Sequence, residues 1–159
     1  MHEHGPFASG RCEVCHVTDA TGNLAPPDLV LKQPDLCYQC HERKDAGKFV
    51  HGALSSFGCT DCHSPHESEQ RFMLISPIRE LCVNCHSAQG VNEAHPHSAV
   101  TMGMGCVRCH ASHSSDYPAL QRRDVTETCI SCHRDFKEKL SNRALNVHAA
   151  MAQGCNACH

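Results

Sequence analysis

The sequence predicts a fold of short α-helices and coil with little or no β structure, organised around bound groups instead of an apolar core. Only 4% of the 159 residues are aromatic and there is no tryptophan, so large apolar side chains are scarce. Against this stand 14 cysteines and 15 histidines. We expect one domain from the chain length. Disulfides, metals or covalent cofactors would have to supply its core.

All the cysteines fall into Cys-x-x-Cys pairs, and each pair is followed directly by histidine. The seven motifs are Cys12–Cys15–His16, Cys37–Cys40–His41, Cys59–Cys62–His63, Cys82–Cys85–His86, Cys106–Cys109–His110, Cys129–Cys132–His133 and Cys155–Cys158–His159. Cys-x-x-Cys-His is the attachment sequence of haem c, in which both thiols bind one porphyrin and the imidazole is the proximal iron ligand. The sequence therefore predicts seven covalently bound haem c groups that form the core.

Other cysteine chemistries explain this pattern less well. Zinc ribbons use two Cys-x-x-Cys knuckles for each metal, and seven is an odd number. A disulfide scaffold gives no reason for a histidine after every pair. Iron–sulfur ligation lacks its usual closely spaced cysteine triplets here.

The motifs recur in units of two. Cys12 lies 47 residues before Cys59, which lies 47 residues before Cys106, and Cys155 follows after another 49. We expect a single heptahaem domain over residues 1–159, built from such repeats. The predicted repeat units are residues 4–50, 51–96 and 97–147, with a half unit at 148–159.

Local signals predict which segments are helical. A histidine upstream of each unit's first motif, with glycine close before that motif, predicts a short helix that carries the histidine and ends at glycine. The second motifs are expected inside capped helices, with Ser76 as cap and Pro77 at the first helical position. The pair Gln33 and Pro34 repeats this arrangement, and the helix around Thr126 is expected to run towards Leu140.

Eight histidines remain after the seven proximal ligands are counted, which is enough to give every iron a second imidazole. These candidate distal ligands are His2, His4, His51, His66, His95, His97, His113 and His148. An iron with two imidazole ligands is low-spin, binds no substrate and changes oxidation state with little rearrangement. Met102, Met104 and Met151 each lie close to a better-placed histidine, so we expect them to pack against haem.

The repeated His…Gly-Cys-x-x-Cys-His-x-x-His, followed by Leu-Cys-x-x-Cys-His, resembles the multihaem cytochromes with paired motifs over residues 4–159. These include low-potential trihaem and tetrahaem cytochromes, decahaem conduits and cytochrome nanowires. In such proteins an upstream histidine commonly binds the haem of the motif it precedes, and a histidine after a motif binds the next haem. The resemblance therefore implies His4 for the haem of Cys12, His51 for Cys59, His97 for Cys106, His148 for Cys155, His66 for Cys82 and His113 for Cys129.

The first unit departs from this pattern. Asp19 stands where the trailing histidine is expected, so the haem of Cys37 and Cys40 lacks its ligand. His95 and His2 are left over, and one of them is expected to bind this iron unless a neighbouring subunit supplies the ligand.

We expect an electron-transfer protein without a catalytic residue. A multihaem reductase is disfavoured because such enzymes often signal an open iron by Cys-x-x-Cys-Lys, which does not occur here. A subunit of a cytochrome filament is the alternative, since the chain stops at His159 in the middle of a repeat.

Charge and hydropathy restrict the partners and the location. There is no basic excess that would indicate nucleic-acid binding and no apolar run of membrane-spanning length. With the haem propionates the net charge is about −10 when oxidised, which favours basic redox partner proteins or cationic extracellular acceptors. Covalent haem is attached after export, so we expect a periplasmic or cell-surface protein whose signal peptide is absent from this numbering.

Overall fold

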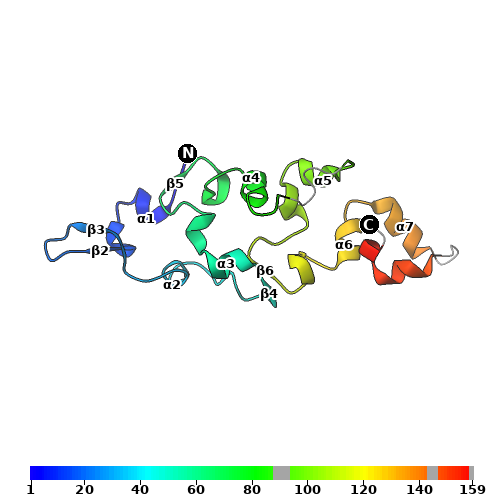
Figure 1. Cartoon of the computed structure of the whole chain (residues 1–159), viewed down its shortest axis with the longest axis horizontal. Helices are drawn as coiled ribbons and strands as arrows, with labels where there is room; N and C mark the ends of the chain where they lie inside the picture. The colour runs from blue at the N-terminus through cyan, green and yellow to red at the C-terminus, as the bar shows by residue number, and fades with distance from the viewer. Residues whose placement is uncertain (88–93, 143–146, 158–159) are drawn as a thin grey trace. The chain divides into compact units, whose positions relative to one another are not determined.

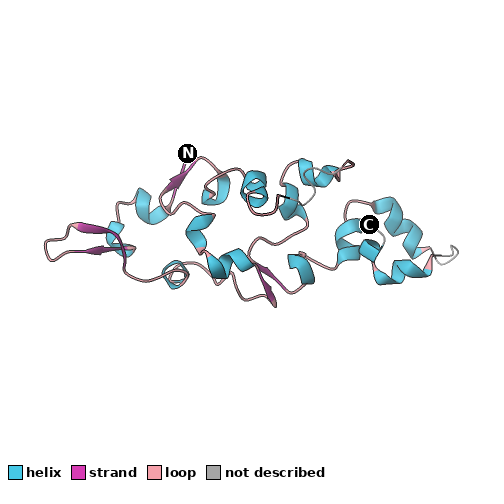
Figure 2. Cartoon of the chain, viewed as in Figure 1, coloured by secondary structure: helices cyan, strands magenta, loops and turns pink. Residues whose placement is uncertain are grey.

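The computed structural model describes residues 1–87, 94–142 and 147–157 (Figure 1). Its Cα positions fall into two compact units, one of residues 1–44 with 52–108 and one of residues 45–51 with 109–159. Short helices and 3₁₀ turns joined by loops make up most of both units (Figure 2). The expectation of short helices and coil is therefore confirmed.

A short helix follows each upstream histidine. These helices are α1 (Gly5–Ala8), α3 (Gly52–Ser56), α5 (Ser98–Thr101) and the 3₁₀ helix η6 (Ala149–Gln153). The histidine does not lie inside the helix as predicted but at its N-terminal cap or directly before it, as His4 before α1 illustrates. Extended backbone at His4 (φ −72°, ψ 136°) allows this residue to end a strand and begin a helix.

The two motif types differ in their helices. First motifs begin in 3₁₀ turns, namely η1 (Cys12–Val14), η2 (Cys59–Asp61), η4 (Gly105–Arg108) and η7 (Cys155–Ala157). Second motifs lie in or at the end of α2 (Asp35–Tyr38), α4 (Ile78–Val83) and α6 (Val125–Ile130).

The predicted caps of the second-motif helices need correction by one position. Pro34 and Pro77 occupy the N-cap itself, one residue before the helical position expected for them, and Ser76 lies outside α4. In the third repeat Asp124 caps α6, where its carboxylate accepts the N–H of Thr126 (2.8 Å). The helix after this motif is separate: α7 (Arg134–Ser141) starts after His133.

The sequence predicts little or no β structure, yet six short strands in the described ranges form three antiparallel pairs. Their bounds are β1 (His2–Glu3), β2 (His16–Thr18), β3 (Leu24–Leu29), β4 (Phe49–Val50), β5 (Glu67–Ser68) and β6 (Ser114–Ser115). β1 pairs with β5, β2 with β3 and β4 with β6. Four of these strands have two residues and β2 has three, too few to show alternation, and two prolines interrupt the sequence pattern of β3.

Two of the strand pairs, β1 with β5 and β4 with β6, recur at the spacing of the sequence repeat. His2 lies opposite Ser68, and Phe49 lies opposite Ser115, so both partners are displaced by the same 47 residues that separate the motifs. Each pair joins the segment before an upstream histidine to the segment after a later first motif.

Two tight turns hold ordinary residues in left-handed backbone conformation. They are η3 (Arg71–Met73), with φ of 61° at Phe72 and 57° at Met73, and η5 (Pro118–Leu120). In η5 the φ values are 53° at Ala119 and 55° at Leu120. Non-glycine residues adopt this conformation at a cost, and strained backbone of this kind clusters at functional sites.

A protein core of the ordinary kind is missing from the described residues. Val107, at 6% exposure, is the buried apolar side chain there, and Ser68 is the buried polar one. Apolar side chains such as Phe57, Phe72 and Met102 are more than half exposed. None of the helices in the described ranges has the length and apolar composition that a membrane span requires.

Asp19 organises the turn between β2 and β3. Its carboxylate accepts hydrogen bonds from the Thr21 hydroxyl (2.7 Å), the Thr21 N–H (2.8 Å) and the Asn23 N–H (2.9 Å). The Thr21 hydroxyl is the largest cause that lowers the pKa of Asp19 from 3.8 to about 2, followed by the backbone N–H groups. The residue that replaces the expected histidine therefore has a structural role.

The strained turns make a prediction about stability. The left-handed conformation costs an L-residue about 1–2 kcal/mol, while glycine loses about 0.4–1 kcal/mol more chain entropy on folding. Ala119→Gly is therefore expected to leave the free energy of unfolding unchanged or to raise it by up to about 1 kcal/mol. Ala53→Gly in α3 is the matched control and should lower it by about 1 kcal/mol. Guanidinium unfolding measures both, and equal losses would contradict the strain.

The Asp19 turn makes a prediction about pH. Because the folded pKa lies below the ordinary value of 3.8, the ionised carboxylate stabilises the turn above that pH, and the stabilisation is lost as the pH falls through about 2. An NMR titration of the reduced protein should show the Asp19 carboxyl and the Thr21 and Asn23 amides moving together near pH 2. Asp19→Asn should abolish this transition, and a midpoint near 3.8 would refute the hydrogen-bonded carboxylate.

Candidate functional site

In the motifs of Cys37 and Cys59, as in others that lie wholly in the described ranges, one tight turn brings the cysteines and the histidine together. The His41 N–H donates to the Cys37 carbonyl (3.0 Å), and in a first motif the Cys62 N–H donates to the Cys59 carbonyl (3.3 Å). None of the thirteen cysteines that lie in the described ranges is in a disulfide. This turn offers two thiols and an imidazole as one unit, as attachment to a single porphyrin requires.

Two proximal imidazoles are fixed by carbonyls of the strained turns. His63 Nδ1 lies 2.8 Å from the Phe72 carbonyl oxygen, and His110 Nδ1 lies 2.8 Å from the Ala119 carbonyl oxygen. A carbonyl can only accept, so Nδ1 carries the proton in both rings and Nε2 keeps its lone pair for a metal. Such a hydrogen bond also makes the imidazole a stronger electron donor to iron.

Two pairs of imidazoles face each other, and each pair joins a motif histidine to a histidine outside the motifs. The ring centroids of His4 and His41 are 5.9 Å apart with planes 19° from parallel. Those of His16 and His66 are 6.0 Å apart with planes 27° from parallel. Two imidazoles on opposite sides of one metal, with each nitrogen about 2 Å from it, have centroids roughly 6 Å apart. The separation of the rings is therefore that of two imidazoles bound to one haem iron.

The surroundings of His16 and His66 agree with this arrangement. Its Nδ1 is buried and has no hydrogen-bond partner among the described residues. Phe7 of α1 packs against His66 with ring centroids 5.0 Å apart, which holds that ring in place. Among the described residues no group of three His, Cys, Asp or Glu side chains gathers at one point. Two protein ligands suffice for haem iron, because the porphyrin supplies the others.

The second motif of the first repeat lies against the first motif of the next. Gln33, just before α2, reaches η2, where its Oε1 accepts the N–H of Cys59 (2.8 Å) and of Thr60 (3.2 Å). Its Nε2 donates to the Thr60 hydroxyl (3.0 Å). Gly58 makes this possible, because a Cβ there would lie 3.0 Å from Gln33 Oε1 and its φ is 98°.

The cysteines at this junction are in contact. Burial, followed by a hydrogen bond with the Cys59 thiol, raises the pKa of Cys37 to about 11. Burial and the neighbouring Cys106 thiol, which also hydrogen bonds it, raise the pKa of Cys82 to about 11. The same kind of contact joins Cys129 to Cys155.

At the junctions of Cys82 with Cys106 and of Cys129 with Cys155, the helix of the second motif contacts the 3₁₀ helix of the next first motif. These contacts are α4 with η4 and α6 with η7. Neighbouring haems attached at each of these thiol pairs would therefore approach each other closely.

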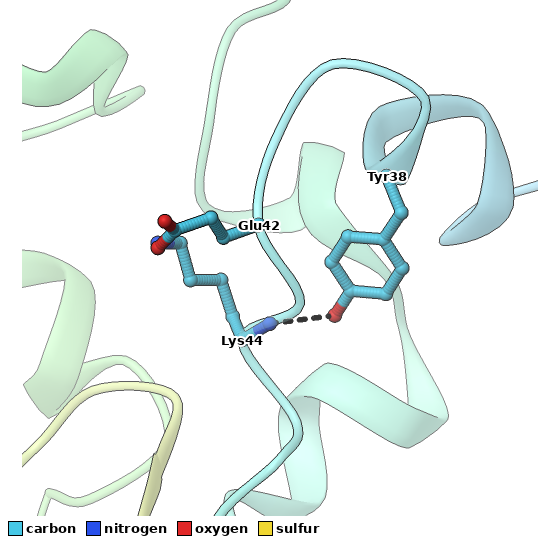
Figure 3. A network of polar contacts seen from close by, with 3 residues as sticks. All are labelled: Tyr38, Glu42 and Lys44. Carbon is cyan, nitrogen blue, oxygen red and sulfur yellow. Dashed lines mark hydrogen bonds and ion pairs between the residues drawn. The ribbon is translucent and has the colours of Figure 1, made fainter.

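The chain after the second motif folds back over Tyr38 (Figure 3). The Tyr38 hydroxyl accepts the Lys44 N–H (3.3 Å), and the Arg43 guanidinium lies 4.6 Å from the centre of the tyrosine ring. Lys44 Nζ and Glu42 Oε2 are 4.0 Å apart, with side chains 48% and 95% exposed, so this ion pair contributes little. The segment keeps Tyr38 beside the Cys37 motif.

The structure shows the surroundings of several predicted site residues. The ring that faces His4 belongs to His41, and the ring that faces His66 belongs to His16. His95 is exposed, and His2 is exposed in β1. His148 Nδ1 accepts the Ala150 N–H (3.2 Å) as the cap of η6. Cys158 and His159 lie outside the described residues.

Sequence reasoning missed two sets of contacts. From the sequence, Gln33 is expected only at the start of a helix. The proline after it and the glycine before Cys59 are the sequence signals for the close approach of these two backbone segments. The carbonyls of Phe72 and Ala119 could not be found, because neither residue type predicts a left-handed turn.

The comparisons with known proteins agree with these motifs. The family described as "Doubled CXXCH motif" matches three times, at residues 4–46, 51–91 and 97–138. The matches start at the first residues of the predicted repeats.

Among curated proteins, the cytochrome c-type protein NrfB of Haemophilus influenzae is 31% identical over an alignment of 83 residues, which covers 48% of this chain. The similar region spans 36% of that relative's length. With three matches over most of the chain, the protein belongs to the doubled CXXCH motif family and is a multihaem c-type cytochrome.

Proposed function

We propose that this cytochrome transfers electrons through seven covalently bound, low-spin haem c groups, each with two imidazole ligands. The facing rings of His4 with His41 and His16 with His66 carry the proposal. When bound, the haem supplies an iron that gains and loses one electron. An imidazole on each side of that iron leaves it no position for a substrate, which favours a carrier over a reductase.

The residues of the chain supply spacing, orientation and insulation for such a relay. Successive motifs are held next to each other by Gln33, which hydrogen bonds the Cys59 N–H. The hydrogen bonds from His63 and His110 to backbone carbonyls fix ring orientation and strengthen electron donation, which lowers the potential of the iron they bind.

The proposed setting is an exported protein that exchanges electrons with other redox proteins or with extracellular acceptors. Attachment of haem to two thiols takes place outside the cytoplasm, so all seven motifs point to a periplasmic or cell-surface location. The formal charge of −3, made more negative by haem propionates, favours basic partner surfaces and salt-sensitive association.

Carbon monoxide tests the proposal. The pyridine haemochrome assay of the holoprotein should give seven haems per chain, matching the seven motifs. The dithionite-reduced protein should then keep its spectrum unchanged under carbon monoxide, because both axial positions of every iron are filled. A reduced spectrum that shifts with carbon monoxide in proportion to one or more haems would show an open iron and favour a reductase.

Gln33→Ala tests the junction between the second and third motifs. Loss of its hydrogen bonds to Cys59 and Thr60 should lower the free energy of unfolding by about 1–2 kcal/mol. It should also weaken the bisignate Soret circular dichroism that neighbouring haems produce. Lys32→Ala, which removes an exposed side chain directly before Gln33 and outside the Cys-x-x-Cys-His motifs, is the matched control and should change neither. Equal effects of the two variants would remove Gln33 from the relay.

A further inference from the structure

We propose that axial ligation in the first repeat is crossed: His4 binds the iron of the Cys37–Cys40 haem opposite His41, and His66 binds the iron of the Cys12–Cys15 haem opposite His16. This inference rests on the proposed function and assigns ligands within it. It differs from the expectation based on resemblance, in which His4 serves the haem of Cys12 and His66 that of Cys82.

The ring geometry is the first observation. Both pairs combine a motif histidine with one from outside the motifs, at centroid separations of 5.9 and 6.0 Å and with planes within 27° of parallel. Two imidazoles bound to one iron through metal–nitrogen bonds of about 2 Å would have centroids roughly 6 Å apart. Both ring pairs match this separation.

The backbone is the second observation. The His4 N–H donates to the His66 carbonyl (2.8 Å), directly beyond the pairing of His2 with Ser68 and Glu3 with Glu67 in β1 and β5. The two outside histidines are therefore neighbours directly beyond the paired ends of β1 and β5, although 62 residues separate them in the sequence. One strand pair thus sets the positions of both ligands.

β5, which pairs with β1, is itself fixed by hydrogen bonds. Ser68 is buried, and its hydroxyl donates to the Leu74 carbonyl while accepting the Gln70 N–H (2.9 Å). Phe7 supports the His66 ring from α1. Residues 1–4 therefore pair with a segment that is fixed by these hydrogen bonds, and the pairing positions His4.

Crossed ligation also accounts for the departure in the first repeat. The Cys37–Cys40 haem lacked a ligand because Asp19 replaces the trailing histidine. His4 supplies that ligand, and Asp19 is committed to the turn formed with Thr21 and Asn23. Neither His2 nor His95 is needed at this iron.

Matched double variants test the assignment by counting low-spin haems with electron paramagnetic resonance of the oxidised holoprotein and carbon monoxide binding of the reduced one. His4→Ala alone should convert one haem per chain to a high-spin, carbon monoxide-binding form. His4→Ala with His41→Ala should still convert one, because both histidines serve the same iron. His4→Ala with His16→Ala should convert two.

The opposite counts, two for the His4 and His41 variant and one for the His4 and His16 variant, would overturn crossed ligation in favour of the register expectation. Two for both would overturn both assignments. His66→Ala with His16→Ala, expected to convert one haem, repeats the test on the second iron, and conversion of two would overturn that half.

A second measurement does not depend on maturation of variants that lack a motif histidine. In a crystal structure of His4→Ala holoprotein grown with free imidazole, the added imidazole should occupy the iron attached to Cys37 and Cys40. Imidazole on the iron attached to Cys12 and Cys15 would overturn the proposal. Failure of the proposed function would be seen separately, as carbon monoxide binding by the unsubstituted protein.

Discussion

In the function proposed here, the constraint on which the rest of the structure depends is that a motif imidazole and a second imidazole from a distant segment meet at one iron. Over the described residues, Val107 is the buried apolar side chain, so close packing of side chains cannot be what holds the segments together. Instead each segment is fixed where a ligand is needed: His4 and His66 are placed by one strand pair, and the motif histidines are placed by tight turns. In the proposed function the haem takes the position of the missing core.

Backbone conformation positions the histidine rings here, a role that side-chain packing has in other proteins. The left-handed residues Phe72 and Ala119 turn their carbonyls towards Nδ1 of His63 and His110. The strain of these turns is of the size of one good hydrogen bond, and it recurs 47 residues apart with the same contacts. A repeated strain of this kind is understandable where ring orientation and electron donation to iron both depend on it.

Repetition of the sequence does not make every unit alike. His63 and His110 have carbonyl partners at Nδ1, whereas His16 Nδ1 has none among the described residues. Asp19, in the same unit, replaces a histidine and shapes a β-hairpin turn. Within the proposed relay, the haem of Cys12 would therefore differ from its counterparts in the electron donation of its proximal ligand.

The sequence by itself determined the haem chemistry, the seven attachment motifs, the repeat and the preference for short helices, because Cys-x-x-Cys-His acts locally and its spacing can be counted. It could not determine the strand pairs, the reach of Gln33 to Cys59, or which imidazole faces which. Strands of two or three residues carry no alternation and prolines mask that of β3, while a glutamine or a histidine has the same local signal whatever it contacts. Only the tertiary structure brings His4, 37 residues away in sequence, to His41, since that contact arises from strand pairing across the repeat and not from any neighbour in the chain.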